Sequence, residues 1–308
     1  MTETTTTPAV RVHDLTKRYG DKTVLDAIDF AIPRDVICGL FGRNGSGKTT
    51  IMSILTAQNF ATSGDVEIFG EHPYENARVL QRMCFVRESQ RYPDDAKPKH
   101  AFAVAQLFFP NWDADFAQRL IDDFRLPMNT RIKKLSRGQL SAVGVIIGLA
   151  ARADVTFFDE PYLGLDAVAR QLFYDRLLAD YAEHPRTIVI SSHLIDEISD
   201  LIEQVLVVDD EQIVVNESVD DLRDRAFTVV GPAGTVDEFI AGREELHREA
   251  LGTVASSTVL GTLTDDDRQR LTAAGLTTAP VSLQELIVRL TQNSDAQHRT
   301  GLTAGAHR

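Results

Sequence analysis

The sequence predicts an α/β fold of buried parallel strands and helices, followed by a small α+β domain. Three apolar runs carry this prediction: Val36 to Phe41, Val155 to Phe158 and Thr187 to Ile190. Each is short and ends at glycine, serine or carboxylate residues, as expected for buried strands of a parallel sheet. After Glu217 the composition shifts to Asp, Arg, Thr and Gly, which marks the second domain. A chain of 308 residues with 43% hydrophobic content can bury a hydrophobic core in each of the two domains.

Residues 10–216 are predicted to form the larger domain. Its first part, to about residue 89, combines an antiparallel strand layer with the first of the three buried strands. A helical insert follows at about residues 90–135, where Phe116, Leu120 and Phe124 recur at helical spacing and prolines interrupt the chain. Parallel strands then resume and complete the domain.

Residues 217–291 are predicted to form an accessory α+β domain, with strand-like runs at residues 227–230 and 258–260. Ser282 followed three residues later by Glu285 is the spacing of a capping box, which indicates a last helix. The apolar stripe of that helix would be Leu283, Leu286, Ile287 and Leu290. The Thr-rich residues 1–9 and the polar residues 292–308 are predicted to be disordered tails.

A glycine-rich loop directly follows the strand that ends at Phe41. It is Gly42-Arg43-Asn44-Gly45-Ser46-Gly47-Lys48-Thr49, a complete G-x-x-x-x-G-K-T pattern, and Thr50 continues it into an amphipathic helix. The glycines let backbone N–H groups wrap phosphate oxygens at the positive end of a helix. Lys48 would reach the β- and γ-phosphates, and the Thr49 hydroxyl would ligate a Mg²⁺ ion that bridges them. The sequence therefore predicts a nucleoside triphosphate site.

Two carboxylates end the strand at residues 155–158. Asp159, at the strand end, suits the metal through water. Glu160 would point the other way by strand alternation and suits a general base for a hydrolytic water. Three further segments accompany this pair along the chain: Leu135-Ser136-Arg137-Gly138-Gln139, Leu163-Gly164-Leu165-Asp166 and Ser191-Ser192-His193.

Taken together and in this chain order, these elements resemble the ATP-binding-cassette (ABC) ATPase family over roughly residues 10 to 215. The resemblance implies a P-loop ATPase core with an antiparallel β subdomain and a helical subdomain. It implies ATP and Mg²⁺ at the glycine-rich loop, and catalytic roles for Lys48, Glu160 and His193. It also implies that Tyr19 stacks on the adenine ring, which is plausible because every base has a π-face.

The same resemblance implies a site that is shared between two ATPase subunits. Ser136, Gly138 and the neighbouring Gln139 would contact the γ-phosphate held on a second copy of the domain. Asp166 would lie at the seam of that dimer, and His193 would hydrogen-bond near the γ-phosphate and the attacking water. A lone monomer would be incomplete, and the second subunit is either identical or different.

The chain departs from the usual family pattern at two places. The signature has Arg137 where the commonest form has a second glycine. In the loop after the strand Met83 to Val86, the family's glutamine position falls on Glu88, while an actual glutamine stands at Gln90. One of these two residues would face the metal or the water, and the sequence leaves the choice open.

The resemblance further implies a transport subunit in the cytoplasm, peripheral to the membrane and coupled to a permease on another chain. The sequence has no run of about 18 uncharged apolar residues and no basic, apolar secretory start. The stretch from Phe108 to Asp113 resembles bacterial exporter ATPases with a separate permease, which favours export. Cys38 and Cys84 lie in apolar runs and are predicted to be inert buried thiols, which fits a reducing cytosol.

A second hypothesis is a soluble ABC ATPase that acts on ribosomes or nucleic acid. The net charge of −13 argues against a broad nucleic-acid-binding surface, because backbone binding needs clustered Lys and Arg. Such relatives usually carry two cassettes or a long coiled coil, and this chain shows one cassette and no sustained heptads. A third hypothesis, a regulatory module that does not hydrolyse nucleotide, is opposed by Lys48 and Glu160.

Overall fold

The computed structural model describes residues 7–88, 90–279 and 281–288. The chain divides into two compact units. The first comprises the residues up to Leu194 together with Asp200–Asn216, and the second comprises Ile195–Ser199 and the residues from Glu217 onward. The main division lies where the composition of the sequence shifts. The short segment Ile195–Ser199, which the sequence places in the larger domain, groups with the second unit.

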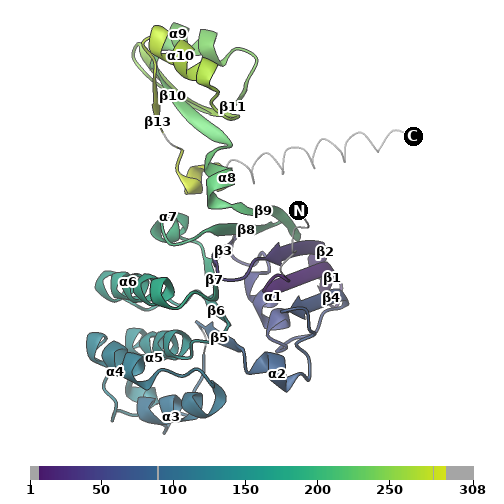
Figure 1. Cartoon of the computed structure of the whole chain (residues 1–308), viewed down its shortest axis with the longest axis vertical. Helices are drawn as coiled ribbons and strands as arrows, with labels where there is room; N and C mark the ends of the chain where they lie inside the picture. The colour runs from purple at the N-terminus through teal and green to yellow at the C-terminus, as the bar shows by residue number, and fades with distance from the viewer. Residues whose placement is uncertain (1–6, 89, 280, 289–308) are drawn as a thin grey trace, which may run out of the picture. The chain divides into compact units, whose positions relative to one another are not determined.

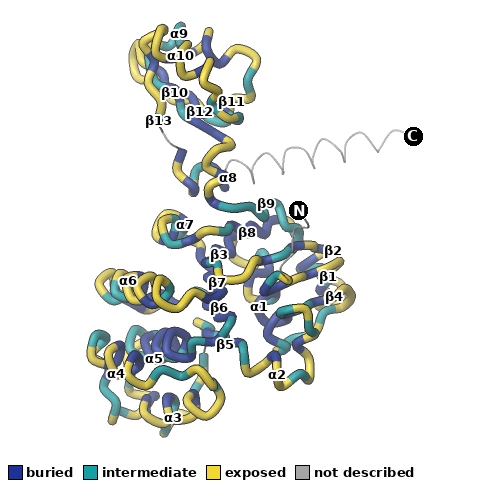
Figure 2. Tube along the Cα trace, in the orientation of Figure 1, coloured by how far each residue is buried: buried dark blue, intermediate teal, exposed yellow. Residues whose placement is uncertain are grey.

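The first unit is built on a six-stranded sheet, seen edge-on in Figure 1. In spatial order its strands are β5 (Met83–Arg87), β6 (Val155–Asp159), β7 (Thr187–Ser192), β3 (Ile37–Phe41), β8 (Gln204–Asp209) and β9 (Gln212–Ser218). The pairs from β5 to β8 are all parallel. Every residue of β3, β6 and β7 is buried, which explains why these strands are continuous apolar runs rather than alternating ones. Figure 2 shows this buried centre.

A three-stranded antiparallel sheet completes the strand structure of the first unit. Its order is β2 (Lys22–Ile32), β1 (Val10–Tyr19) and β4 (Ser63–Ile68). Ala9 is fully buried, its N–H donates to Ile32 O at 2.9 Å, and its carbonyl accepts from Phe69 N–H at 2.9 Å. The prediction of a disordered tail is therefore wrong at Ala9, because this backbone extends the sheet; residues 1–6 and 292–308 lie outside the described residues.

Helices cover both faces of the six-stranded sheet. In Figure 1, α5 and α6 lie on one side, and α1 with the three-stranded sheet lies on the other. The helices of the first unit are α1 (Lys48–Leu55), α2 (Ala77–Leu80), α3 (Pro98–Phe108), α4 (Ala114–Asp123), the 3₁₀ turn η1 (Ile132–Lys134), α5 (Arg137–Ala150) and α6 (Ala167–Glu183). The predicted helical spacing is confirmed in α4, where Phe116 and Leu120 are buried and Phe124 follows as the C-cap residue. No helix in the described part of the chain is long and apolar enough to cross a membrane.

The two cysteines are buried in this core as free thiols. Cys38 lies in β3 and Cys84 in β5. Burial raises the pKa of each thiol to about 12. Both are therefore protonated at neutral pH, as expected for inert core residues.

The second unit is an antiparallel sheet with helices. Its strands, in spatial order, are β11 (Glu244–Leu251), β12 (Val254–Leu260), β10 (Ala226–Pro232) and β13 (Thr277–Ala279). Its labelled helices are α7 (Ile195–Ile198), α8 (Val219–Arg223), α9 (Ala233–Ile240) and α10 (Asp265–Ala273), and residues 283–288 are also helical. Phe227, Val229 and Val259 from the sheet pack with Val236 and Phe239 from α9. The two strands predicted from the sequence are present as β10 and β12.

The predicted last helix begins as expected but lacks the predicted reciprocal cap. Residues 283–288 are helical, and Ser282 Oγ accepts from Glu285 N–H at 3.1 Å. The Glu285 carboxylate instead accepts from Thr258 Oγ1 at 3.4 Å. Leu286 and Ile287 are buried, while Leu290 lies outside the described residues.

Gly148 sets how closely α5 lies on the sheet. A Cβ atom there would lie 2.4 Å from Phe158 Cε1 and 2.8 Å from Val86 Cγ2. Alanine is ordinarily about 1 kcal/mol better than glycine in a helix, but overpacking costs about 1–3 kcal/mol. We therefore expect Gly148→Ala to lower the free energy of unfolding by up to about 2 kcal/mol, measured by denaturant or thermal unfolding.

Gly234→Ala in α9 is the matched control. A Cβ atom there would meet nothing within 4 Å, so this variant should be as stable as the parent or more stable. Equal stability of the two variants would contradict the close packing of α5.

Candidate functional site

The loop between β3 and α1 has a backbone that favours glycine. Gly42, Gly45 and Gly47 have φ angles of 150°, 84° and 109°. At Gly42 a Cβ atom would lie 2.3 Å from Val208 O. Gly47 is the N-cap of α1 and offers no side chain, which leaves the first N–H groups of the helix for an anionic ligand.

Lys48 lies folded over this loop. Its ammonium donates to Gly42 O at 2.6 Å and to Arg43 O at 3.1 Å. Burial lowers the pKa of Lys48, and the nearby charges of Glu160 and Asp159 oppose that shift. The cation is thus held where the loop turns.

Ser46 contributes a buried hydroxyl to the same loop. Among the described residues its Oγ has no hydrogen-bond partner. A buried polar atom of this kind costs free energy unless it is paired. A phosphate oxygen is a suitable acceptor, so the loop fits a phosphorylated ligand.

Asp159 joins three elements at the edge of the sheet. Its carboxylate accepts from Thr49 Oγ1 of α1 and from Ser191 Oγ of β7, both at 2.7 Å. The carboxylate is almost fully buried. Thr49 and Asp159 form an oxygen donor set of the kind that Mg²⁺ prefers.

Glu160 is placed by a strained turn rather than by the strand. The predicted reason, strand alternation, is wrong: β6 ends at Asp159, and Glu160 has a φ of 50°, in the left-handed region. Its N–H donates to Ser191 Oγ at 3.0 Å. Its Oε2 lies 2.7 Å from His193 Nδ1 and accepts from the Tyr162 hydroxyl at 2.8 Å.

Tyr162 holds the two predicted catalytic residues together. It is fully buried, and its hydroxyl lies 3.2 Å from His193 Nδ1 and 3.0 Å from Ser192 Oγ. Burial is the main cause that raises the pKa of Tyr162, so the hydroxyl is protonated and can donate to Glu160. Glu160, Tyr162 and His193 therefore form one hydrogen-bonded cluster.

These groups surround one cavity of about 480 Å³ in the first unit. It is lined by Val24, Asn44, Gly45, Gly47, Lys48, Thr49, Thr50, Glu88, Asp159, Glu160, Leu163 and His193. The structure thus brings ten of the predicted site residues together around the glycine-rich loop. Gly42 and Ser46 belong to the same loop but do not line the cavity.

Tyr19 lies outside this cavity, at the end of β1. It is half exposed, with the Lys17 ammonium 4.6 Å from its ring centroid and Asn59 Nδ2 donating to its hydroxyl at 2.6 Å. Adenine stacking on this ring stays a prediction.

The signature residues form helix caps in this chain. Ser136 is the N-cap of α5: its hydroxyl accepts from Gln139 N–H, and Gln139 Oε1 accepts from Ser136 N–H at 3.0 Å. Gly138 follows in the first turn, where a Cβ atom would lie 2.7 Å from Gly164 O. Asp166 caps α6 through Ala169 N–H at 2.8 Å. None of these four residues lines the cavity around the glycine-rich loop. Their roles toward a second subunit stay predictions.

The structure separates the two candidates in the loop after β5. Glu88 lines the nucleotide-loop cavity, whereas Gln90 lines a different, apolar cavity. The placement favours Glu88 over Gln90 as the residue beside Asp159. Sequence spacing alone left both residues as candidates, because the path of the loop decides which side chain faces the nucleotide-loop cavity.

Sequence reasoning missed two residues that organise this site. Ser191 hydrogen-bonds both Asp159 and the backbone of Glu160, and Tyr162 bridges Glu160 and His193. A signal was present for each. Ser191 ends a buried strand, and Tyr162 is an aromatic with a polar tip two residues after the proposed base.

Comparison with known proteins agrees with this geometry. Residues 25–163 match the family model described as ABC transporter. The chain is 30% identical over 216 residues to the uncharacterised ABC transporter ATP-binding protein MJ1023 of Methanocaldococcus jannaschii, covering 70% of this chain and 79% of that protein. This chain belongs to the ABC transporter ATP-binding proteins. It is accordingly an ATPase subunit.

Two further likenesses extend this assignment. The chain is 26% identical over 300 residues to the doxorubicin resistance ATP-binding protein DrrA of Mycobacterium tuberculosis, covering 91% of this chain and 90% of that protein. The solved structure of an ATP-binding subunit of an ABC transporter superposes with a TM-score of 0.63 at 20% identity, covering 70% of this chain and 92% of that one. The structural likeness confirms the predicted ABC ATPase fold.

Tyr162→Phe tests whether the cluster positions Glu160, the predicted base. The variant keeps the ring but loses the hydrogen bond to a charged group, which is worth about 1.5–3 kcal/mol. We expect kcat for ATP hydrolysis to fall roughly 10-fold or more, with the Kd for ATP unchanged.

Tyr181→Phe is the matched control. The Tyr181 hydroxyl donates to the Glu203 carboxylate at 2.7 Å, and neither residue lines the cavity. It should lose stability and keep kcat. Equal kcat values for the two variants would show that Tyr162 has no role beyond packing.

Proposed function

We propose that this ABC ATPase subunit energises export through a separate membrane permease, using ATP and Mg²⁺ at the cavity around the glycine-rich loop. The observation that carries the proposal is the meeting of Lys48, Thr49, Asp159, Glu160 and His193 at one cavity. These side chains come from the end of β6, from the residues directly after β6 and β7, and from the start of α1. Together they supply a phosphate clamp, a metal-binding edge and a proton acceptor.

The residues at this cavity fit ATP with one Mg²⁺ ion. Lys48 and the N–H groups at the start of α1 would hold the phosphates, with Ser46 Oγ as a further donor. Thr49 and Asp159 would hold Mg²⁺, which neutralises charge on the phosphates when bound. The described residues contain no group of three or more His, Cys, Asp or Glu side chains that could hold a metal. This suits Mg²⁺, which usually keeps waters and substrate oxygens as ligands.

Glu160 is proposed as the general base. Tyr162 and His193 hold its Oε2, which leaves Oε1 to accept a proton from the attacking water. The side chain of Glu160 is mostly buried, whereas that of His193 is 40% exposed. We propose that His193 hydrogen-bonds the γ-phosphate as well as Glu160, and its partial exposure supports this role.

Two subunits are proposed to complete each site. Ser136, Gly138 and Gln139 lie at the start of α5, and they would reach the γ-phosphate on the other subunit. The hydroxyl of Ser136 and the N–H groups of this helix end are suited to an anion. Asp166 would lie at the seam, and Tyr19 would stack on adenine.

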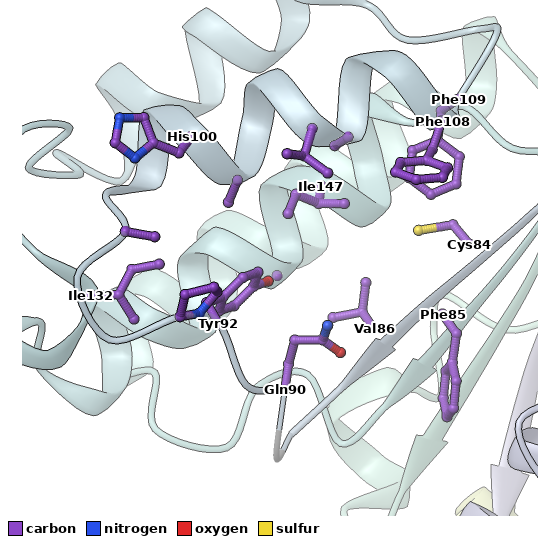
Figure 3. Close-up of a pocket in the computed structure, with 16 residues that line it drawn as sticks. Cys84, Phe85, Val86, Gln90, Tyr92, His100, Phe108, Phe109, Ile132 and Ile147 are labelled. Carbon is purple, nitrogen blue, oxygen red and sulfur yellow. The ribbon is translucent and has the colours of Figure 1, made fainter.

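An apolar cavity of about 480 Å³ is the proposed docking site for the permease. Its walls come from α3, α5, β5 and the segment after β5, as Figure 3 shows. Val104 and Phe108 of α3 line it and are 52% and 66% exposed. Exposed apolar side chains around a hollow are typical of a protein interface, and the transport relatives make a membrane permease the proposed occupant.

Export is the proposed direction for two reasons. The stretch Phe108 to Asp113 resembles exporter ATPases with a separate permease, and a relative along most of the chain is named for doxorubicin resistance. Removal of a compound is one way for a transporter to serve resistance. We also propose that the chain lies in the cytoplasm at the membrane surface, where its binding to the permease holds it.

Glu160→Gln tests the chemistry. The amide keeps the size of the side chain but cannot accept the proton, so phosphate release should fall roughly 10²- to 10⁴-fold. ATP binding should survive, and an ATP-bound dimer should accumulate in size-exclusion chromatography with ATP and Mg²⁺. Lys48→Ala is the contrasting variant and should lose both nucleotide binding and dimer. Near-normal turnover in Glu160→Gln would remove Glu160 from the role of base.

Val104→Glu tests the docking site. A carboxylate in the apolar cavity should weaken permease binding about 10-fold or more, because its charge would be desolvated. The readout is the share of the chain recovered with the membranes of cells that make its native partners. Leu107→Glu is the control, since Leu107 is 84% exposed on the same helix and does not line the cavity. Both variants should keep the ATPase activity of the purified chain, and equal recovery of the two would contradict the docking site.

A further inference from the structure

The two departures from the family pattern meet in space. Arg137, the first residue of α5, donates a hydrogen bond from its guanidinium to Glu88 Oε1, and the two side chains form an ion pair. They are 49 residues apart in the sequence. Each substitution, taken by itself, places an unpaired charge near the nucleotide cavity; together they compensate each other.

The charge of the cavity shows why the pairing matters. Among the described residues that line it, Lys48 is the one lysine or arginine, while Glu88, Asp159 and Glu160 are carboxylates. Asp159 is held by Thr49 and Ser191, and Glu160 by Tyr162 and His193. A triphosphate is strongly anionic, so a third carboxylate at this edge would repel it unless a cation neutralised that carboxylate.

Packing holds Arg137 in place to do this. Its side chain runs over the turn at Gly164, where a Cβ atom would lie only 2.7 Å from Arg137 Cγ. Ser141 Oγ of α5 donates to Leu163 O at 2.6 Å and fixes the same turn. The stem of Arg137 is thereby guided from the start of α5 to Glu88.

We propose that Arg137 and Glu88 are a matched pair of positioning residues, in which Arg137 neutralises Glu88 so that the cavity can accept the triphosphate. The pair belongs to the proposed nucleotide site and rests on that function. Because the pair is 68% exposed at Arg137 and 39% at Glu88, it contributes little to folding stability. Its effect is expected on the bound anion.

A double-mutant cycle tests the pair. The proteins are the parent, Arg137→Gln, Glu88→Gln and the double variant, with Arg137→Lys as the conservative change. The readout is the Kd for a fluorescent ATP analogue at low protein concentration, first in EDTA and then with Mg²⁺. Low concentration keeps a second subunit, which the signature would contact, out of the measurement.

Arg137→Gln should weaken binding in EDTA roughly 3- to 10-fold, since Glu88 then faces the triphosphate without its cation. The double variant should return to within about twofold of the parent, and Arg137→Lys should recover part of the loss. The defect of Arg137→Gln should shrink with Mg²⁺, because the cation offsets the exposed carboxylate. A purely structural role would leave the same defect in both conditions and in the double variant.

Arg78→Gln is the matched control, since it breaks the exposed ion pair of Arg78 with Glu71 on a different part of the unit. It should leave the Kd unchanged. Unchanged binding in Arg137→Gln, or a double variant as weak as Arg137→Gln, would overturn the pairing while the parent still binds nucleotide. A parent that binds no nucleotide, like Lys48→Ala, would instead overturn the proposed function itself.

Discussion

The site depends on the parallel pairing of three fully buried strands, β3, β6 and β7. The register sets Asp159 beside Ser191 and Phe41 beside Ser192, so the carboxyl ends of all three strands meet at one edge of the sheet. The glycine-rich loop begins at that edge. Asp159, whose carboxylate is proposed to bind the metal, is the last residue of β6 there. Because both faces of these strands are closely packed, a slip in register would disrupt the packing of the buried side chains, and this penalty fixes the geometry of the site.

Hydrogen bonds convert that edge into a chemically specific site. Asp159 has two hydroxyl donors, and Glu160 is held in a strained backbone conformation by Tyr162, Ser191 and His193. Strain of about 1–3 kcal/mol persists in proteins only where the surroundings impose it, and such residues cluster at functional sites. The side chain of Glu160, the proposed base, is therefore held in place by the protein alone, and such preorganisation would lower the reorganisation needed in the reaction.

The first turn of α5 connects nucleotide chemistry to assembly. Ser136 and Gln139 cap one another, so the signature is ordered in a single chain. Arg137 of the same turn pairs with Glu88 at the cavity, while Ser141 fixes the turn before Asp166. A few polar contacts thus link the cavity to the first turn of α5, which is proposed to meet the second subunit.

The sequence by itself determined the family, the nucleotide loop, the strand ends and the candidate acids, because these depend on residue type and short spacing. Five ordered motifs are enough for that. Only the tertiary structure decided the contacts between distant segments: the Arg137–Glu88 pair, the bridging hydroxyl of Tyr162 and the placement of Glu88 and Gln90 at different cavities. Strand alternation predicted the wrong reason for the direction of Glu160, because a positive φ ends the strand one residue earlier. Loop directions and cross-segment contacts follow from packing of the whole unit, so a local signal such as that of Tyr162 does not specify which distant residues the side chain meets.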